Sequence, residues 1–129
     1  MDLVTVVLSL ALVEYIVFAV LVGRARGQYG VNAPAVTGHE MFERYYRVQM
    51  NTLELLVVFV PAILTFAHYV SARWAAGLGA VYVVGRVIYL MSYVKNPASR
   101  GAGFGLSMLP IMAMVVGTLI AAVQKVFGG

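Results

Sequence analysis

Three polar residues, which carry a cation, an amide and a carboxylate, open a long apolar segment of this chain. The run 42–54 reads FERYYRVQMNTLE and places Arg47, Asn51 and Glu54 at helical spacing, so that they share one helix face. Such groups are costly to bury in a membrane; they usually face a bundle interior or a wet cavity and indicate a functional site. The alternative interpretation is that they bind one another and only hold the helices together.

A second polar stripe follows in the next apolar segment. Tyr82, Arg86, Tyr89 and Tyr93 recur at intervals that place them on one face of a helix. Tyrosines near a membrane surface often form only an interfacial belt, but Arg86 lies too deep in its segment for that interpretation. We expect an ion pair between Arg86 and Glu54 to align the two stripes.

Arg100 lies in a short connection just before the last apolar segment. By position alone it is either a cationic anchor at the membrane surface or part of a site. Arg47, Arg86 and Arg100 converge at one side of the membrane, and together with Arg24 or Arg26 they form a basic pocket. Arginine is suited to bidentate recognition of carboxylates. The sequence therefore predicts a small, anionic, cytosolic ligand.

The composition indicates an integral membrane protein. The chain has 129 residues, of which 62% are hydrophobic and 11% charged, whereas a soluble domain carries about a quarter charged residues. Four apolar stretches exceed the ~20 residues that a helix needs to cross a bilayer, and helices satisfy their own backbone groups there. We predict one all-α domain, 1–129, with spans at roughly 3–22, 45–70, 74–94 and 104–127.

The basic residues predict the topology, since cytoplasmic loops are enriched in arginine and lysine. They place the first and third loops in the cytoplasm and both termini in the periplasm or lumen. Glycine and proline in the first connection predict a loop from Gly23 to Arg44. Within it, Thr37 and Glu40 fit a capping box, so the second helix is expected to start near Gly38. The basic residues in or beside the two loops are Arg24, Arg26, Arg44, Arg47, Lys95 and Arg100.

Several kinds of chemistry are excluded or left open by the residue types. The absence of cysteine excludes a disulfide, a thiol nucleophile and a thiolate metal site. His39 and His68 are too far apart in the sequence for metal-ligand spacing, so we predict no metal. The positive charges flank spans, and we predict no nucleic-acid partner. Glu14, near the middle of the first span, is either a proton-coupled transport site or the partner of a polar group on another helix.

The runs FERYYRVQMNTLE and GRVIYLMSYVKNPASRG resemble the MAPEG family, the membrane-associated proteins in eicosanoid and glutathione metabolism. The resemblance covers nearly the whole chain and is greatest to the branch of microsomal glutathione transferases of the second and third types and leukotriene C synthase. It implies a four-helix protomer that forms a homotrimer, with active sites between subunits at the cytosolic side.

The resemblance also implies a role for each polar residue. Arg100 matches the family's arginine that stabilises the thiolate of the co-substrate glutathione. Glutathione itself would be bound by residues of the second and third helices and by one arginine of the first loop, namely Arg26, Arg47, Gln49, Asn51, Glu54, Arg86, Tyr89 and Tyr93. Leu55 stands where close relatives have tyrosine, and Ile88 replaces a basic residue of the leukotriene synthase. These departures favour a general detoxifying transferase over eicosanoid synthesis.

The expected mechanism is electrostatic. A free thiol has a pKa near ~8.5, and lowering it by ~2 units takes about 2.7 kcal/mol of preferential thiolate stabilisation, which one arginine in a water-poor site can supply. The thiolate would then attack a lipophilic electrophile or a lipid hydroperoxide, so we expect a membrane-bound glutathione transferase or peroxidase. The alternatives are a non-enzymatic, lipid-binding member of the family and a small proton-coupled multidrug transporter that uses Glu14.

Overall fold

A computed structural model describes residues 1–128, and its long elements are all helices. The described residues contain no strand, and each long helix has the length and apolar composition needed to cross a membrane. The predicted all-α, four-span architecture is therefore confirmed. The elements are α1 (Asp2–Tyr29), α2 (Glu40–Tyr69), α3 (Ala72–Lys95), the short 3-10 helix η1 (Pro97–Ser99) and α4 (Gly101–Phe127).

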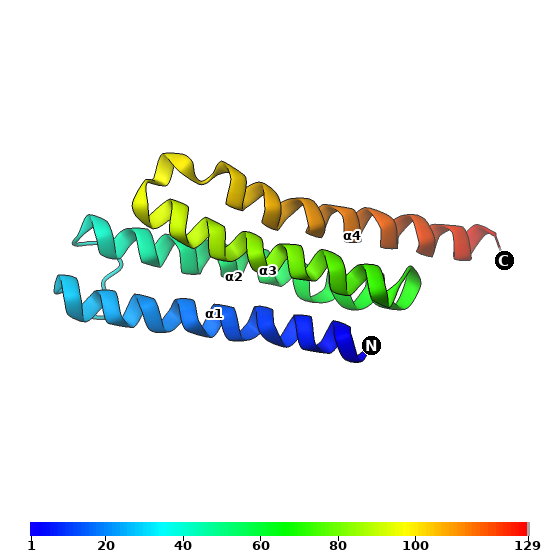
Figure 1. The fold of residues 1–129 in the computed structure, drawn as a ribbon, viewed down its shortest axis with the longest axis horizontal. Coiled ribbons are helices and arrows are strands. Elements are labelled where there is room, and N and C mark those ends of the chain that lie inside the picture. The colour runs from blue at the N-terminus through cyan, green and yellow to red at the C-terminus, as the bar shows by residue number, and fades with distance from the viewer. Residues whose placement is uncertain (129) are drawn as a thin grey trace.

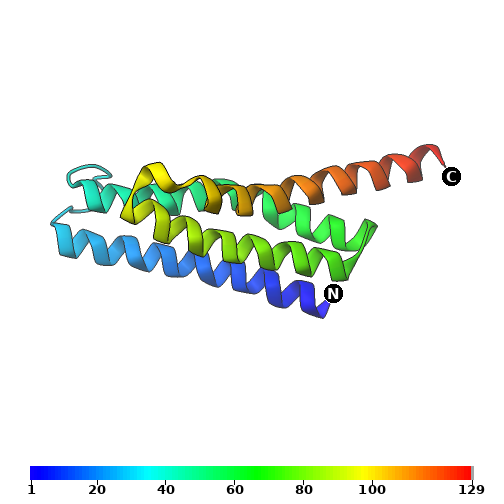
Figure 2. The ribbon, with the colours of Figure 1, turned by 45° about the horizontal axis from the view of Figure 1, so that its top comes forward.

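The four helices lie side by side in an up-and-down bundle (Figure 1). The α1–α2 and α3–α4 connections share one end, which we call the loop end. The start of α1, the α2–α3 connection and the end of α4 share the other, which we call the terminus end. The last turns of α4 extend beyond the other helices at the terminus end, as both ribbon views show (Figures 1 and 2).

The core is formed by inward stripes that repeat every three or four residues along each helix, the period expected for one buried face. Its centre is apolar, and the Phe59 and Tyr82 rings stack there with centroids 4.0 Å apart. Lipid tails are as apolar as leucine, so packing between the helices must hold them together. The inward stripe of α1 consists of Val4, Val7, Ala11, Glu14, Phe18, Val22 and Ala25.

The first connection is shorter than the sequence predicts. We expected a loop from Gly23, but α1 continues to Tyr29. It continues because the residues after the span keep the inward period: Val22 and Ala25 are buried in a small cluster with Phe42. The helix ends at Gly30, which adopts a left-handed φ of 68°, a conformation that glycine reaches without steric cost.

The start of α2 also differs from the expected Thr37–Glu40 capping box, and that prediction is wrong. The helix begins at Glu40, and His39 is its N-cap residue. The His39 Nδ1 atom accepts a hydrogen bond from the Met41 backbone N–H at 3.1 Å. Glu43 accepts one from the Gly38 N–H at 3.2 Å. The helix cannot include Gly38, because its φ of 140° lies outside the helical region.

Candidate functional site

A polar cavity of about 270 Å³ opens between α2, α3 and the start of α4 near the loop end. The first polar stripe lines one wall, because its residues recur on a single face of α2. Tyr89 and Tyr93 line the facing wall from α3, and their rings stack with centroids 5.5 Å apart. The complete lining consists of Arg47, Met50, Asn51, Glu54, Tyr89, Tyr93 and Arg100.

Arg100 reaches the cavity from the N-cap position of α4. The turn that places it there is closed by local hydrogen bonds: the Asn96 side chain accepts from the Ala98 N–H at 3.1 Å, and the Ser99 hydroxyl donates to the Ser92 carbonyl at 3.0 Å. The Arg100 carbonyl then accepts the first helical bond of α4, from Phe104. Both the arginine and the positive end of the helix dipole therefore favour an anion at this position.

Arg86 lies behind the cavity wall and is completely buried. Its Nε donates to the Ser107 Oγ at 2.8 Å, and its Nη1 donates to the Asn51 Oδ1 at 2.7 Å. The same Nη1 lies 3.1 Å from the Thr52 Oγ1. The guanidinium also stacks over the Tyr89 ring, 4.3 Å from its centroid. One side chain of α3 thus fixes two cavity residues and joins α2 to α4.

The expected ion pair between Arg86 and Glu54 is not formed. Within residues 1–128 the only ion pair joins Arg44 to Glu40, at 2.6 Å. Glu54 is exposed and lines the cavity instead. The physical reason is the height of Arg86 along the bundle. Arg86 packs at the level of Asn51 and Thr52, about one helical turn nearer the loop end than Glu54. These two residues therefore accept its hydrogen bonds.

Besides Arg86, two of the residues predicted to bind glutathione, Arg26 and Gln49, lie outside the cavity lining of this single chain. Arg26 is half-buried, donates to the Ala35 carbonyl at 2.7 Å and stacks over the Phe42 ring at 4.8 Å, so it ties the first loop to α2. Gln49 is half-buried on α2 and is absent from the cavity lining. Arg24 lines a different cavity, with Gln28, Tyr29 and Tyr45 among its neighbours. Their glutathione-binding roles stay predictions.

Sequence reasoning missed the acceptors that fix Arg86. Thr52 and Ser107 are completely buried, and each hydroxyl also donates to a carbonyl four residues earlier, Val48 and Gly103 respectively. The position of Thr52 in the sequence could have indicated this role. Thr52 falls among the buried apolar residues of α2, where a hydroxyl needs a hydrogen-bond partner. Ser107 occupies the corresponding place on the inward face of α4.

A second missed contact closes the loop end of the bundle. The Arg44 Nη1 donates to the Val94 and Lys95 carbonyls at 2.9 and 3.2 Å. These carbonyls belong to the last turn of α3, which has no partners of its own within the helix. Arg44 therefore caps α3 from α2, rather than acting only as a charge at the membrane surface.

Comparison of the sequence with known proteins identifies the family of this chain. The model of the MAPEG family matches residues 4–120, which is most of the chain. The chain is a member of the MAPEG family. It is 47% identical over 113 residues to an uncharacterised protein of Synechocystis sp., covering 88% of this chain and 82% of that protein.

Two named relatives share the matched region. Similarity to microsomal glutathione S-transferase 2 of Homo sapiens amounts to 40% identity over 105 residues, covering 81% of this chain and 69% of that protein. Similarity to leukotriene C4 synthase of Cavia porcellus amounts to 34% over 83 residues, covering 64% of this chain and 55% of that protein. The MAPEG membership confirms the resemblance inferred from the polar stripes, and it places the cavity in a membrane protein with glutathione-dependent relatives.

Proposed function

We propose that this MAPEG protein is a membrane-bound glutathione transferase whose site is the cavity lined by Arg47, Asn51, Glu54, Tyr89, Tyr93 and Arg100. The observation that carries the proposal is the chemistry of this lining. Arg47 matches a carboxylate of glutathione, Arg100 matches its thiolate, and Glu54 offers an acceptor for its amino group. The volume of about 270 Å³ suits a small polar ligand and not a macromolecule.

In the proposed mechanism Arg100 supplies the electrostatic stabilisation. Its position at the start of α4 directs a cation and a helix N-terminus at the same point, and both favour the thiolate over the thiol. The thiol proton leaves to solvent through the open cavity. The thiolate sulfur then forms a bond to the electrophilic carbon of a lipophilic substrate, and the leaving group departs with the bonding electrons.

The same thiolate supports a peroxidase reaction. Two glutathione molecules are oxidised to the disulfide while a lipid hydroperoxide is reduced to the alcohol and water. We propose this as a secondary activity, because it uses the same activated sulfur and needs no further group. The non-enzymatic alternative is disfavoured by the presence of Arg100 in the lining, since mere lipid binding does not need a cation there.

Orientation and assembly belong to the same proposal. Six basic residues lie near the loop end, as the bounds of α1 to α4 place them, so we propose that this end faces the cytosol, where glutathione would enter. We further propose a homotrimer, in which Arg26 of one protomer supplies a cation to the site of the next. Large apolar residues cover the outer faces of the helices, Val57 and Leu109 among them, which suits lipid or subunit contact.

The experiment is a conjugation assay on purified protein in detergent, with glutathione and an aryl halide as the test electrophile. We expect glutathione to raise the melting temperature and to be conjugated, since a ligand that binds only the folded state stabilises it. N-acetylcysteine is the control thiol. It has the same nucleophile but only one carboxylate, whereas glutathione has two. Absence of both a glutathione-dependent thermal shift and conjugation overturns the proposal, whereas equal rates with the two thiols overturn the role of Arg47.

A further inference from the structure

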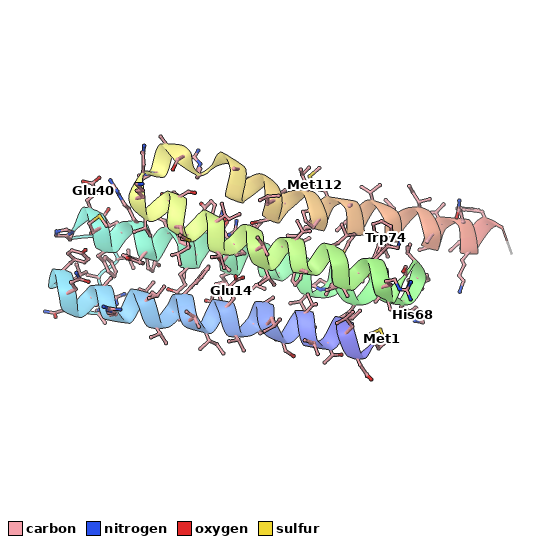
Figure 3. All side chains as sticks on the ribbon, in the orientation of Figure 1. Met1, Glu14, Glu40, His68, Trp74 and Met112 are labelled. Carbon is pink, nitrogen blue, oxygen red and sulfur yellow. The ribbon has the colours of Figure 1, made fainter. Side chains whose placement is uncertain are left out.

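A buried carboxylate lies on α1, outside the cavity lining. Glu14 is only 8% exposed and occupies the inward stripe of α1 between Ala11 and Phe18. Figure 3 shows it on the side of α1 that faces the other helices. Neither of its carboxylate oxygens accepts a hydrogen bond from any residue that the structure describes. A carboxylate at this depth is expensive unless another group compensates its charge.

Two polar groups of α3 share the bundle interior with Glu14. Tyr82 and Arg86 are completely buried, and the Tyr82 hydroxyl and the Arg86 Nη2 have no hydrogen-bond partner among the described residues. Glu14, Tyr82 and Arg86 thus each bury a polar atom that no described residue satisfies. The Phe59 ring covers one side of Tyr82 at 4.0 Å. We call Glu14, Tyr82 and Arg86 the deep cluster.

The charge of Arg86 identifies its counter-charge. Arginine stays protonated in proteins, and the three hydrogen bonds of this guanidinium go to neutral oxygens only. Glu14 is the only carboxylate among the buried residues that the structure describes, whereas Glu54 is exposed. A buried cation without a counter-charge is strongly destabilising, so Glu14 is the group that offsets it.

We infer that Glu14 is the counter-charge of Arg86 and that, through Arg86, it positions Asn51 and Tyr89 for ligand binding. Glu14 is thus a positioning residue and touches no substrate. The second half of the inference rests on the proposed function of the cavity; the first half does not. It also gives Glu14 a role other than proton-coupled transport, because both of its carboxylate oxygens are buried inside the bundle.

The consequence of losing Glu14 follows from the neighbouring charges. Without its counter-charge, Arg86 is attracted to the next carboxylate, Glu54 in the cavity wall. Movement in that direction breaks the 2.7 Å bond to Asn51 and the stacking on Tyr89. Glutathione binding therefore weakens, while Arg100, the proposed thiolate-stabilising residue, keeps its place on α4.

The first experiment needs no glutathione. Melting temperatures are measured for the wild type, Glu14→Gln, Arg86→Met and the double variant in the same detergent. Each single substitution leaves a buried charge unpaired, and the double substitution leaves none. We expect the double variant to melt well above the temperature predicted by adding the two single shifts, as interacting neighbours do. Additive shifts overturn the whole inference, whatever the protein binds.

The second experiment repeats the cycle with glutathione and the aryl halide. We expect Glu14→Gln to raise KM for glutathione about fivefold or more, to change kcat less than about twofold, and to have no further effect in the Arg86→Met background. Asp2→Asn is the matched control: it removes one negative charge from an exposed site at the far end of α1 and should leave KM unchanged.

The outcomes separate the two proposals. Non-additive effects of the two substitutions on both the melting temperature and KM support the inference in full. Non-additive melting shifts with an unchanged KM support the counter-charge role of Glu14 and overturn its positioning role. A wild type that neither binds nor conjugates glutathione overturns the proposed function, while the first experiment still tests the counter-charge role. Loss of proton-coupled drug transport in Glu14→Gln, with additive melting shifts, favours the transporter and overturns the inference.

Discussion

The two halves of the bundle are held together differently. Towards the loop end, side-chain hydrogen bonds join α2, α3 and α4 through Arg86, and a polar cavity lies in front of them. Towards the terminus end the core is apolar, with Phe59, Ile63 and Met114 completely buried. In the apolar half any side chain of suitable volume can pack. In the polar half each donor needs one particular acceptor, and that requirement fixes the cavity.

Helix packing distances show the same contrast. A Cβ added at Gly103 would lie 2.5 Å from the Tyr89 backbone nitrogen, and one at Gly85 would lie 2.8 Å from the Ser107 nitrogen. At Gly79, in the apolar half, the obstacles are the ends of the Val7 and Ile63 side chains. Near the cavity α3 and α4 are thus in backbone contact, whereas elsewhere flexible side chains fill the space.

The largest effect on catalysis is expected from an arginine at the loop end, compared with an arginine at the terminus end. Arg100→Ala should lower kcat/KM for conjugation by about 10²-fold or more, the usual cost of removing a group that stabilises developing negative charge. Arg73→Ala is the control, since Arg73 is exposed at the terminus end and should leave the rate unchanged. Steady-state kinetics with the aryl halide measures both. Equal losses would mean that membrane orientation, and not the cavity, explains the effect.

The glycine contrast predicts the next largest effect. Gly103→Ala should destabilise the protein by about 2–3 kcal/mol, because backbone cannot move aside as side-chain ends can, whereas Gly79→Ala should cost less than about 1 kcal/mol. Unfolding in a denaturing detergent, followed by circular dichroism, measures both. A larger cost at Gly79 contradicts the account of the two halves.

A smaller effect is expected for single hydrogen bonds on α2. Asn51→Ala removes the acceptor of Arg86 Nη1 and should raise KM for glutathione about tenfold, the cost of leaving a buried charged donor short of one partner. Thr65→Ala on the same helix breaks only local bonds to the Pro61 and Ala62 carbonyls and should not change KM. If Asn51→Ala behaves like Thr65→Ala, Arg86 does not need this acceptor.

The smallest effect is expected at the Arg44–Glu40 ion pair. Glu40 is largely exposed, and Arg44 keeps its bonds to the α3 carbonyls without it. Glu40→Gln should therefore cost less than about 1 kcal/mol of stability, while Arg44→Met should cost more because it uncaps α3. Thermal unfolding of both variants measures which substitution costs more stability. A larger cost for Glu40→Gln would show that the ion pair contributes more than the cap.

These contrasts also explain what could be predicted from the sequence. The four spans follow from apolar length alone, and the polar stripes follow from helical period. The partner of Arg86 does not follow, because Asn51 and Glu54 share one face of α2 and only the relative height of α2 and α3 selects between them. The roles of Thr52 and Ser107 as acceptors of Arg86 were not predicted. A single hydroxyl in an apolar stripe does not indicate which side chain donates to it.

The loop boundaries were mispredicted for a related reason. Gly23 and Gly27 read as loop residues, but the burial of Val22 and Ala25 against Phe42 carries α1 past them. Tertiary packing outweighs the low helix propensity of glycine, which costs only about 1 kcal/mol per residue. Helix ends that depend on such long-range contacts cannot be located from local sequence.

In the proposed mechanism, Arg100 at the start of α4 lowers the thiol pKa of bound glutathione. A pH titration of the ultraviolet thiolate absorbance of the protein–glutathione complex measures this pKa in the wild type and in Arg100→Ala. We expect a thiol pKa about 2 units below the free value of ~8.5 in the wild type and a value close to the free one in the variant. Equal thiol pKa values in the two complexes would show that Arg100 does not stabilise the thiolate.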